Sequence, residues 1–122
     1  MNEEQSGRAQ LPNLGEAIDR LADEMDEIHR HHSGTTIEYV RGLTVFAVRE
    51  GPRLSFRLRP EVVAAGLRTP DTGISARGAD WITLTPAVVD GFALDRALSW
   101  FESAWRLAGE GGRDVSPRAL PN

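Results

Sequence analysis

The segment from residue 36 to residue 60 constrains the fold more than any other part of this sequence. It reads T-I-E-Y-V-R-G-L-T-V-F-A-V-R-E-G-P-R-L-S-F-R-L-R-P and is broken at Gly42 and at Gly51-Pro52. Runs rich in β-branched and aromatic residues between such breaks are typical of strands. We therefore expect three strands, with an antiparallel hairpin at the glycine–proline turn. The expected strands span residues 37–41, 43–49 and 53–59.

The last expected strand has the most regular alternation of side chains. Leu54, Phe56 and Leu58 alternate with polar residues, so one face is apolar and the other basic. This basic face is the candidate surface for a polyanion or for an acidic protein partner, such as the acidic N-terminal segment of a second copy. A solvated face whose arginine stems cover apolar surface would give the same pattern. The arginines concerned, including one from the preceding strand, are Arg49, Arg53, Arg57 and Arg59.

The segment before these strands predicts a helix from Leu14 to about His31. Asn13 and Glu16 fit a capping box at its start, and Ser33-Gly34 fits its end. Apolar residues recur at alternating spacings of three and four, which is the heptad pattern. A helix packed on its own sheet explains this pattern, and so does the seam of a weak homodimer. The seam residues are Leu11, Leu14, Ile18, Leu21, Met25 and Ile28.

The second half of the chain predicts a short helix from Pro60 to about Leu67, with proline at its first position. A polar, glycine-bearing loop is expected over residues 69–80, followed by a fourth strand at residues 81–84. Thr85-Pro86 then favours a brief helical turn that ends near residue 90.

A long C-terminal helix is expected from residue 93 to residue 108, packed on the sheet. Its broad apolar stripe indicates a buried helix, and Trp105 is expected among the most buried residues. Gly109 is expected to end it. We therefore expect one domain over residues 11–108, a disordered tail at residues 1–10 and a flexible tail at residues 109–122. The stripe consists of Leu94, Leu98, Phe101, Trp105 and Ala108.

Composition sets the broad class of protein. A chain of 122 residues with 40% hydrophobic and 26% charged residues is typical of one globular domain. It has no cysteine, which excludes disulfides, thiolate nucleophiles and cysteine-based zinc sites. No apolar run reaches the roughly 20 residues that span a bilayer, and the N-terminal residues are unlike a signal peptide. We therefore expect a cytoplasmic protein without a membrane partner. The net charge of −4 disfavours wholesale nucleic-acid binding.

No set of residues indicates catalysis, a metal or another cofactor. His29, His31 and His32 are close in sequence to acidic residues, but a transition-metal site needs three or more convergent ligands. Adjacent histidines cannot both face one site from a regular helix, so we expect a solvated helix end. The segment Gly73–Gly78 is one residue longer than a nucleophile elbow, and every histidine lies at residues 29–32. We therefore expect no enzymatic activity.

Three segments resemble the MmcQ/YjbR family of small bacterial proteins. They are R-L-S-F-R-L-R-P-E-V at residues 53–62, D-W-I-T-L at 80–84 and S-W-F-E-S-A-W-R-L-A at 99–108. The resemblance covers roughly residues 13–108 and implies an α+β fold similar to a double-wing arrangement that is sometimes associated with DNA binding. The family's biochemical role is largely undefined. Its members usually have a fuller and more basic loop before the tryptophan strand.

These observations predict an α+β domain with a meander of about three strands and a fourth, tryptophan-initiated strand. The expected function is binding or regulation through protein–protein interaction. The alternative is a nucleic-acid-binding domain that uses the arginine-rich strand face.

Overall fold

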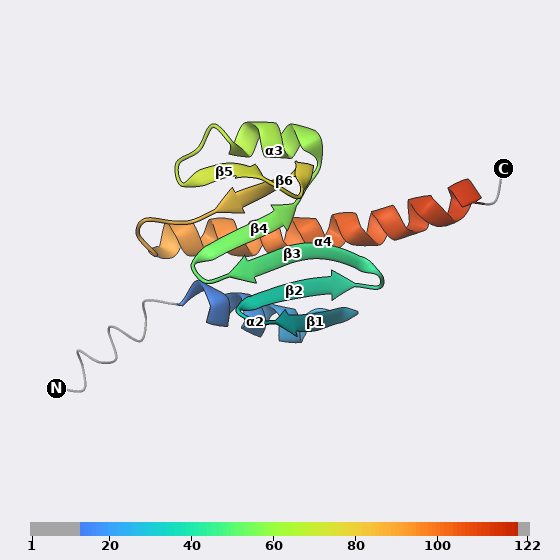
Figure 1. Ribbon diagram of the computed structural model, residues 1–122, viewed down its shortest axis with the longest axis horizontal. Coiled ribbons are helices and arrows are strands. Elements are labelled where there is room, and N and C mark those ends of the chain that lie inside the picture. The colour runs from blue at the N-terminus through green and yellow to red at the C-terminus, as the bar shows by residue number, and fades with distance from the viewer. Residues whose placement is uncertain (1–12, 120–122) are drawn as a thin grey trace.

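The computed structural model describes the backbone of residues 13–119 and the side chains of residues 13–110. It confirms the α+β class, with three helices in the described part of the chain and one six-stranded antiparallel sheet. The strands lie in the order β1-β2-β3-β4-β6-β5 (Figure 1). The elements are α2 (Leu14–Glu24), β1 (Ile28–Ser33), β2 (Thr36–Arg41), β3 (Thr44–Glu50), β4 (Arg53–Arg57), α3 (Pro60–Gly66), β5 (Thr72–Ser75), β6 (Gly78–Leu84) and α4 (Gly91–Ala119).

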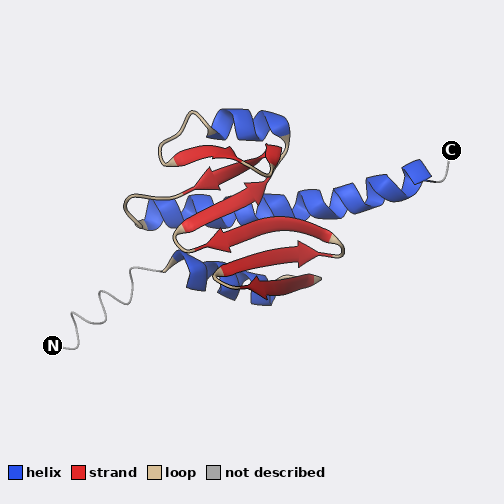
Figure 2. Ribbon diagram, in the orientation of Figure 1, coloured by secondary structure: helices blue, strands red, loops and turns tan. Residues whose placement is uncertain are grey.

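All three helices lie on the same face of the sheet (Figure 2). The ring of Phe101 in α4 packs edge-on against Tyr39 and Phe46, with 5.2 Å between centroids in each pair. Trp100 of α4 packs against Phe56 at 6.0 Å. Gly66 of α3 lies against Ile82 and Trp100, which places α3 on this side too. The opposite face is covered by no helix of the described residues.

The predicted apolar face of β4 is confirmed. Leu54, Phe56 and Leu58 are all buried in the core beneath the helices. The predicted hairpin of β3 and β4 is also present, with Gly51 in the left-handed region at the turn. A β-bulge in β3 adds one residue, because Val40 pairs with Val45 whereas Tyr39 pairs with Ala47. Phe46 is that extra residue, and it is buried.

The predicted long N-terminal helix is wrong beyond Glu24. The cap at its start is confirmed, because the Glu16 amide donates to the Asn13 side chain at 3.1 Å. The chain then turns at Glu27, which has a positive φ, and residues 28–33 form β1 instead of the last helical turns. Six cross-strand pairs with β2 outweigh the helical preference of this segment. Gly34 therefore occupies a hairpin turn and not a helix end.

The residues of the expected dimer seam are used inside the fold. Leu14 and Ile18 are buried, and Leu21, Met25 and Ile28 pack against the same core. Ile28 reaches that core from β1, which explains why the heptad spacing extended past the end of α2. Leu11 lies outside the described residues, as does the expected tail at residues 1–10.

The expected loop over residues 69–80 is wrong, because it contains β5 and the start of β6. The two strands form a hairpin around Ala76-Arg77, and Gly78 has a φ of 144°, which favours glycine. The sheet thus has six strands, and β6 begins before Trp81. No helical turn forms over residues 85–90.

The long C-terminal helix is present, but its bounds and buried stripe differ from those expected. It spans Gly91–Ala119 and does not end at Gly109. A Cβ at Gly109 would lie 2.5 Å from Arg41 Nη1, so this glycine allows a close approach. Trp105 is only half-buried. Small residues let the helix approach the sheet, and the buried stripe is Ala93, Ala97, Phe101, Ala104 and Ala108.

Candidate interaction surface on the open face of the sheet

The four arginines of the predicted basic surface do not form one row. Arg49 points to the helix side, where its Nη2 lies 3.3 Å from Asp19 Oδ2. Arg57 lies on the open side, and its Nε donates to Asp80 Oδ2 at 3.0 Å. Arg53 is also on the open side, 3.9 Å from Glu50. Arg59 occupies the N-cap position of α3, and its side chain pairs with Glu110 of α4. Each of the four therefore has a carboxylate neighbour.

A different set of residues gathers on the side of the sheet that no described helix covers. Phe56 faces the helices, so its neighbours Ser55 and Arg57 face the other way. The cross-strand pairs extend this side over the other strands, since directly paired residues share a face. We call this surface the open face. It includes His29, His31, Glu38, Val40, Val45, Val48, Glu50, Arg53, Ser55, Arg57, Trp81 and Thr83.

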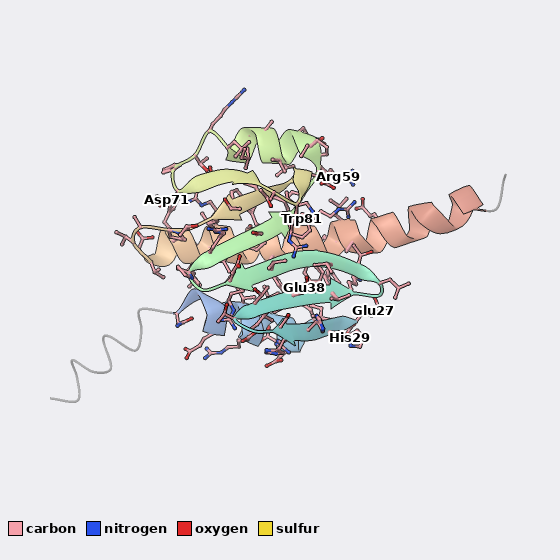
Figure 3. The ribbon with its side chains drawn as sticks, viewed as in Figure 1. Glu27, His29, Glu38, Arg59, Asp71 and Trp81 are labelled. Carbon is pink, nitrogen blue, oxygen red and sulfur yellow. The ribbon has the colours of Figure 1, made fainter. Side chains whose placement is uncertain are left out.

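One row of the open face crosses five strands in register. His31 pairs with Glu38, Glu38 with Val48, Val48 with Ser55, and Ser55 with Thr83. Figure 3 labels Glu38 and Trp81 on β2 and β6, and His29 on β1. The open face thus combines residues from β1 to β6 that are far apart in the sequence.

The centre of the open face is buried although no described helix covers it. Val48, Ser55 and Trp81 are only 5%, 8% and 7% exposed. Arg77, from the β5–β6 turn, stacks on the Trp81 ring at 5.1 Å, and its Nη2 donates to Glu38 Oε2 at 3.2 Å. Because β3 and β4 lie between β2 and β6, this bridge passes over them. We call it the Arg77–Glu38 bridge.

Charge is unevenly distributed around this centre. Two acidic residues of the face, Glu38 and Glu50, lie on β2 and β3, and Asp80 of β6 pairs with Arg57. The basic residues lie on β4 and on the β5–β6 turn, namely Arg53, Arg57 and Arg77. His31 Nδ1 lies 3.3 Å from Glu38 Oε1. One half of the face is therefore acidic with flanking histidines, and the other half is mainly basic.

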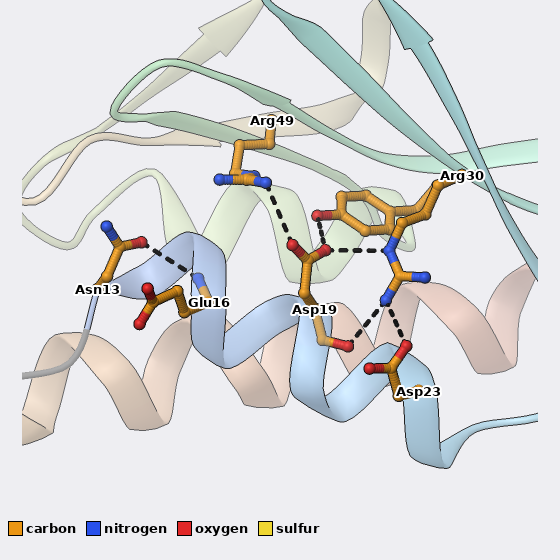
Figure 4. A network of polar contacts seen from close by, with 7 residues as sticks. Asn13, Glu16, Asp19, Asp23, Arg30 and Arg49 are labelled. Carbon is orange, nitrogen blue, oxygen red and sulfur yellow. Dashed lines mark hydrogen bonds and ion pairs between the residues drawn. The ribbon is translucent and has the colours of Figure 1, made fainter.

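A second polar cluster lies on the helix side, around Asp19 of α2 (Figure 4). The Asp19 carboxylate accepts from Tyr39 Oη at 2.8 Å, from Arg30 Nε at 3.0 Å and from Arg49 Nη2 at 3.3 Å. Burial, followed by the bond to Asp19, raises the pKa of Tyr39 to about 12. A phenol with that pKa stays protonated at neutral pH and is no general base. The cluster ties α2 to β1, β2 and β3.

The sequence predicted that the histidines lie at a helix end, but they lie on β1. His29 and His31 lie on the open face, whereas His32 alternates to the other side. Within the described residues, no three His, Asp or Glu side chains converge as metal ligands.

Two shallow cavities lie away from the open face. One, of about 310 Å³, lies at the start of α2 beside Arg49 and Pro52. The other, of about 200 Å³, lies between α3 and α4 beside Arg59 and Arg106.

Neither sequence nor structure comparison assigns a family. No protein-family model, curated protein or solved structure matches this chain. The resemblance to MmcQ/YjbR proteins therefore stays a prediction. Among the described helices, none is both long enough and apolar enough to cross a membrane.

Proposed function

We propose that this chain is a protein-binding domain that docks its partner on the open face of the sheet. The observation that carries this proposal is the position of all three described helices on one side of the sheet. On the other side, Val48, Ser55 and Trp81 are buried with no described helix over them, and Arg77 of the Arg77–Glu38 bridge stacks on the Trp81 ring. A partner that displaces or joins this bridge gains a contiguous apolar surface.

The make-up of the open face supports a protein as the partner. Protein interfaces combine an apolar centre with a polar rim, and tryptophan and arginine are enriched among their energetically dominant residues. Trp81 and the valines form the centre here, and the charges surround them. Five strands with a spacing of about 4.8 Å and a length of about 17–20 Å give a footprint of roughly 400–500 Å² for each copy. That is below the ~800 Å² per partner of a standard interface, so we expect weak binding.

Nucleic-acid binding through the arginines is less well supported. Arg49 faces away from Arg53 and Arg57, and all four arginines have carboxylate neighbours. We expect no salt-sensitive binding to duplex or single-stranded DNA in fluorescence anisotropy at about 50 mM salt, where charge contacts are strongest. Binding with a log–log salt slope near about −3.6, as four neutralised phosphates require, would contradict this expectation.

Photo-crosslinking within cells that make the protein tests the proposed function. A photoreactive amino acid replaces Thr83, which lies on the open face. The matched control replaces Ser99, an exposed residue of similar size on α4. We expect a protein adduct from position 83 and none from position 99. The Val48→Glu variant, which places a charge at the centre of the face, should lose the adduct. Equal yields from both positions, or no adduct from position 83, would refute the proposal.

A further inference from the structure

The charges of the open face are arranged so that the face can complement itself. Glu38 and Glu50 lie on the β2–β3 half, and Arg53, Arg57 and Arg77 lie on the half formed by β4 and the β5–β6 hairpin. A two-fold interface brings the same patch of both subunits together, so it is favourable where opposite charges exchange places. We propose that the partner docked on the open face is a second copy of this chain. This inference rests on the proposed function and names its partner.

The strand order determines which two-fold axis suits these charges. Face-to-face packing requires an axis in the plane between the two sheets. An axis along the strands, between β3 and β4, places β2 of one copy opposite β6 of the other, because the order is β1-β2-β3-β4-β6-β5. Glu38 of each copy then meets the β6 side of the other, where Arg77 stacks on Trp81. The Arg77–Glu38 bridge can therefore form between copies as well as within one.

An axis across the strands is unfavourable. It would place each strand opposite its own copy, so that the acidic residues of β2 and β3 would face the same acidic strands of the partner and the arginines of β4 would face β4. Like charges brought together at an interface oppose association. The charge pattern thus selects the axis along the strands, and it predicts aligned packing of the two sheets at about 30°.

The seam expected on the N-terminal helix is less suited to this contact than the open face. Leu14 and Ile18 are buried within their own chain, and Leu21, Met25 and Ile28 pack on that same core. In the described part of the chain, the open face instead has partly exposed Val40 and Val45 beside the bridge. The footprint of roughly 400–500 Å² is well below the ~800 Å² per partner of a standard interface. We therefore expect a weak dimer.

Charge exchange between two variants tests the second copy directly. Sedimentation equilibrium of the wild type should show a monomer–dimer equilibrium between tens of micromolar and about 1 mM. Glu38→Arg and Arg77→Glu should each weaken self-association at least tenfold, because like charges then face each other across the axis. An equimolar mixture of the two variants should dimerise again, since each then meets its opposite charge in trans. A bridge that acts only within one chain would give no such rescue. Glu102→Arg and Arg106→Glu, on the outer side of α4, are the matched controls and should have no effect.

A second measurement avoids charge changes and reports the axis. The chain has no cysteine, so Thr83→Cys provides a single site for a nitroxide label. When labelled protein is mixed with ¹⁵N wild type, amides near Glu38 should broaden more strongly than those near Thr83. Stronger broadening near Thr83 than near Glu38 would indicate the other axis and refute the proposed geometry. A wild type that remains monomeric at 1 mM would refute the second copy. An adduct from position 83 to a different protein would then leave the proposed function standing.

Discussion

Phe101→Ala should destabilise the fold by about 3–5 kcal/mol, which is typical of aromatic truncations in cores. Phe101 is fully buried, and its ring packs edge-on against Tyr39 and Phe46 at the centre of the helix–sheet interface. Its removal loses burial and leaves a cavity between α4 and two strands. Against a typical total of about 5–15 kcal/mol, the variant would be marginally stable. The midpoint of urea unfolding measures the loss.

Two control variants make this result specific. Trp105→Ala should cost less, about 1–2 kcal/mol, although the sequence placed Trp105 among the most buried residues. It is half-buried, and it contributes a stacking contact with Arg41 at 3.9 Å and a hydrogen bond to the Asp26 carbonyl. Leu43→Ala, at a fully exposed turn position, should cost almost nothing. A larger loss for Trp105→Ala than for Phe101→Ala would show that Trp105 is a core residue, as the sequence predicted.

The sequence predicted the elements that local signals define. The Asn13 cap, the hairpin of β3 and β4 and the proline start of α3 depend on residues close together in the chain. It missed β1 because the spacing of apolar residues continued as in a helix. That segment becomes a strand through its pairing with β2 and the ion pair of Arg30 with Asp19. These are contacts that periodicity cannot indicate.

The candidate site was predictable only in part. Alternation correctly placed Arg53 and Arg57 on the face away from Leu54 and Phe56. It could not show that Arg49 lies on the other side, because pairing in register with Leu54 turns it toward α2. Nor could it show that Arg77 reaches Glu38, since that contact joins residues 39 positions apart. The contact depends on β6 lying between β4 and β5, and the order of strands in a sheet is not a local property.

The protein should lose stability between about pH 10 and pH 12 through a single side chain, Tyr39. The sequence contains one tyrosine, no lysine and no cysteine, so no other side chain titrates in this range apart from the onset of arginine. Burial and the hydrogen bond to Asp19 raise the pKa of Tyr39 to about 12 from its ordinary value of 10.0. Absorbance of the phenolate near 295 nm should therefore rise well above pH 10, and in urea it should rise near pH 10.

The sign of the effect follows from proton linkage. The folded state holds the Tyr39 proton more tightly than the unfolded state, so its contribution is fully present below pH 10. It is lost as the pH rises through about 12, and a pKa shift of about two units corresponds to about 2–3 kcal/mol.

Tyr39→Phe should be less stable than the wild type at pH 7, because Asp19 loses a donor. The variant should also lack most of the alkaline decline. Asp19→Asn should lower the pKa of Tyr39 by removing the charged acceptor, although burial still keeps it above 10. If Tyr39→Phe loses stability above pH 10 as much as the wild type does, another group causes the alkaline decline and the Tyr39–Asp19 bond does not.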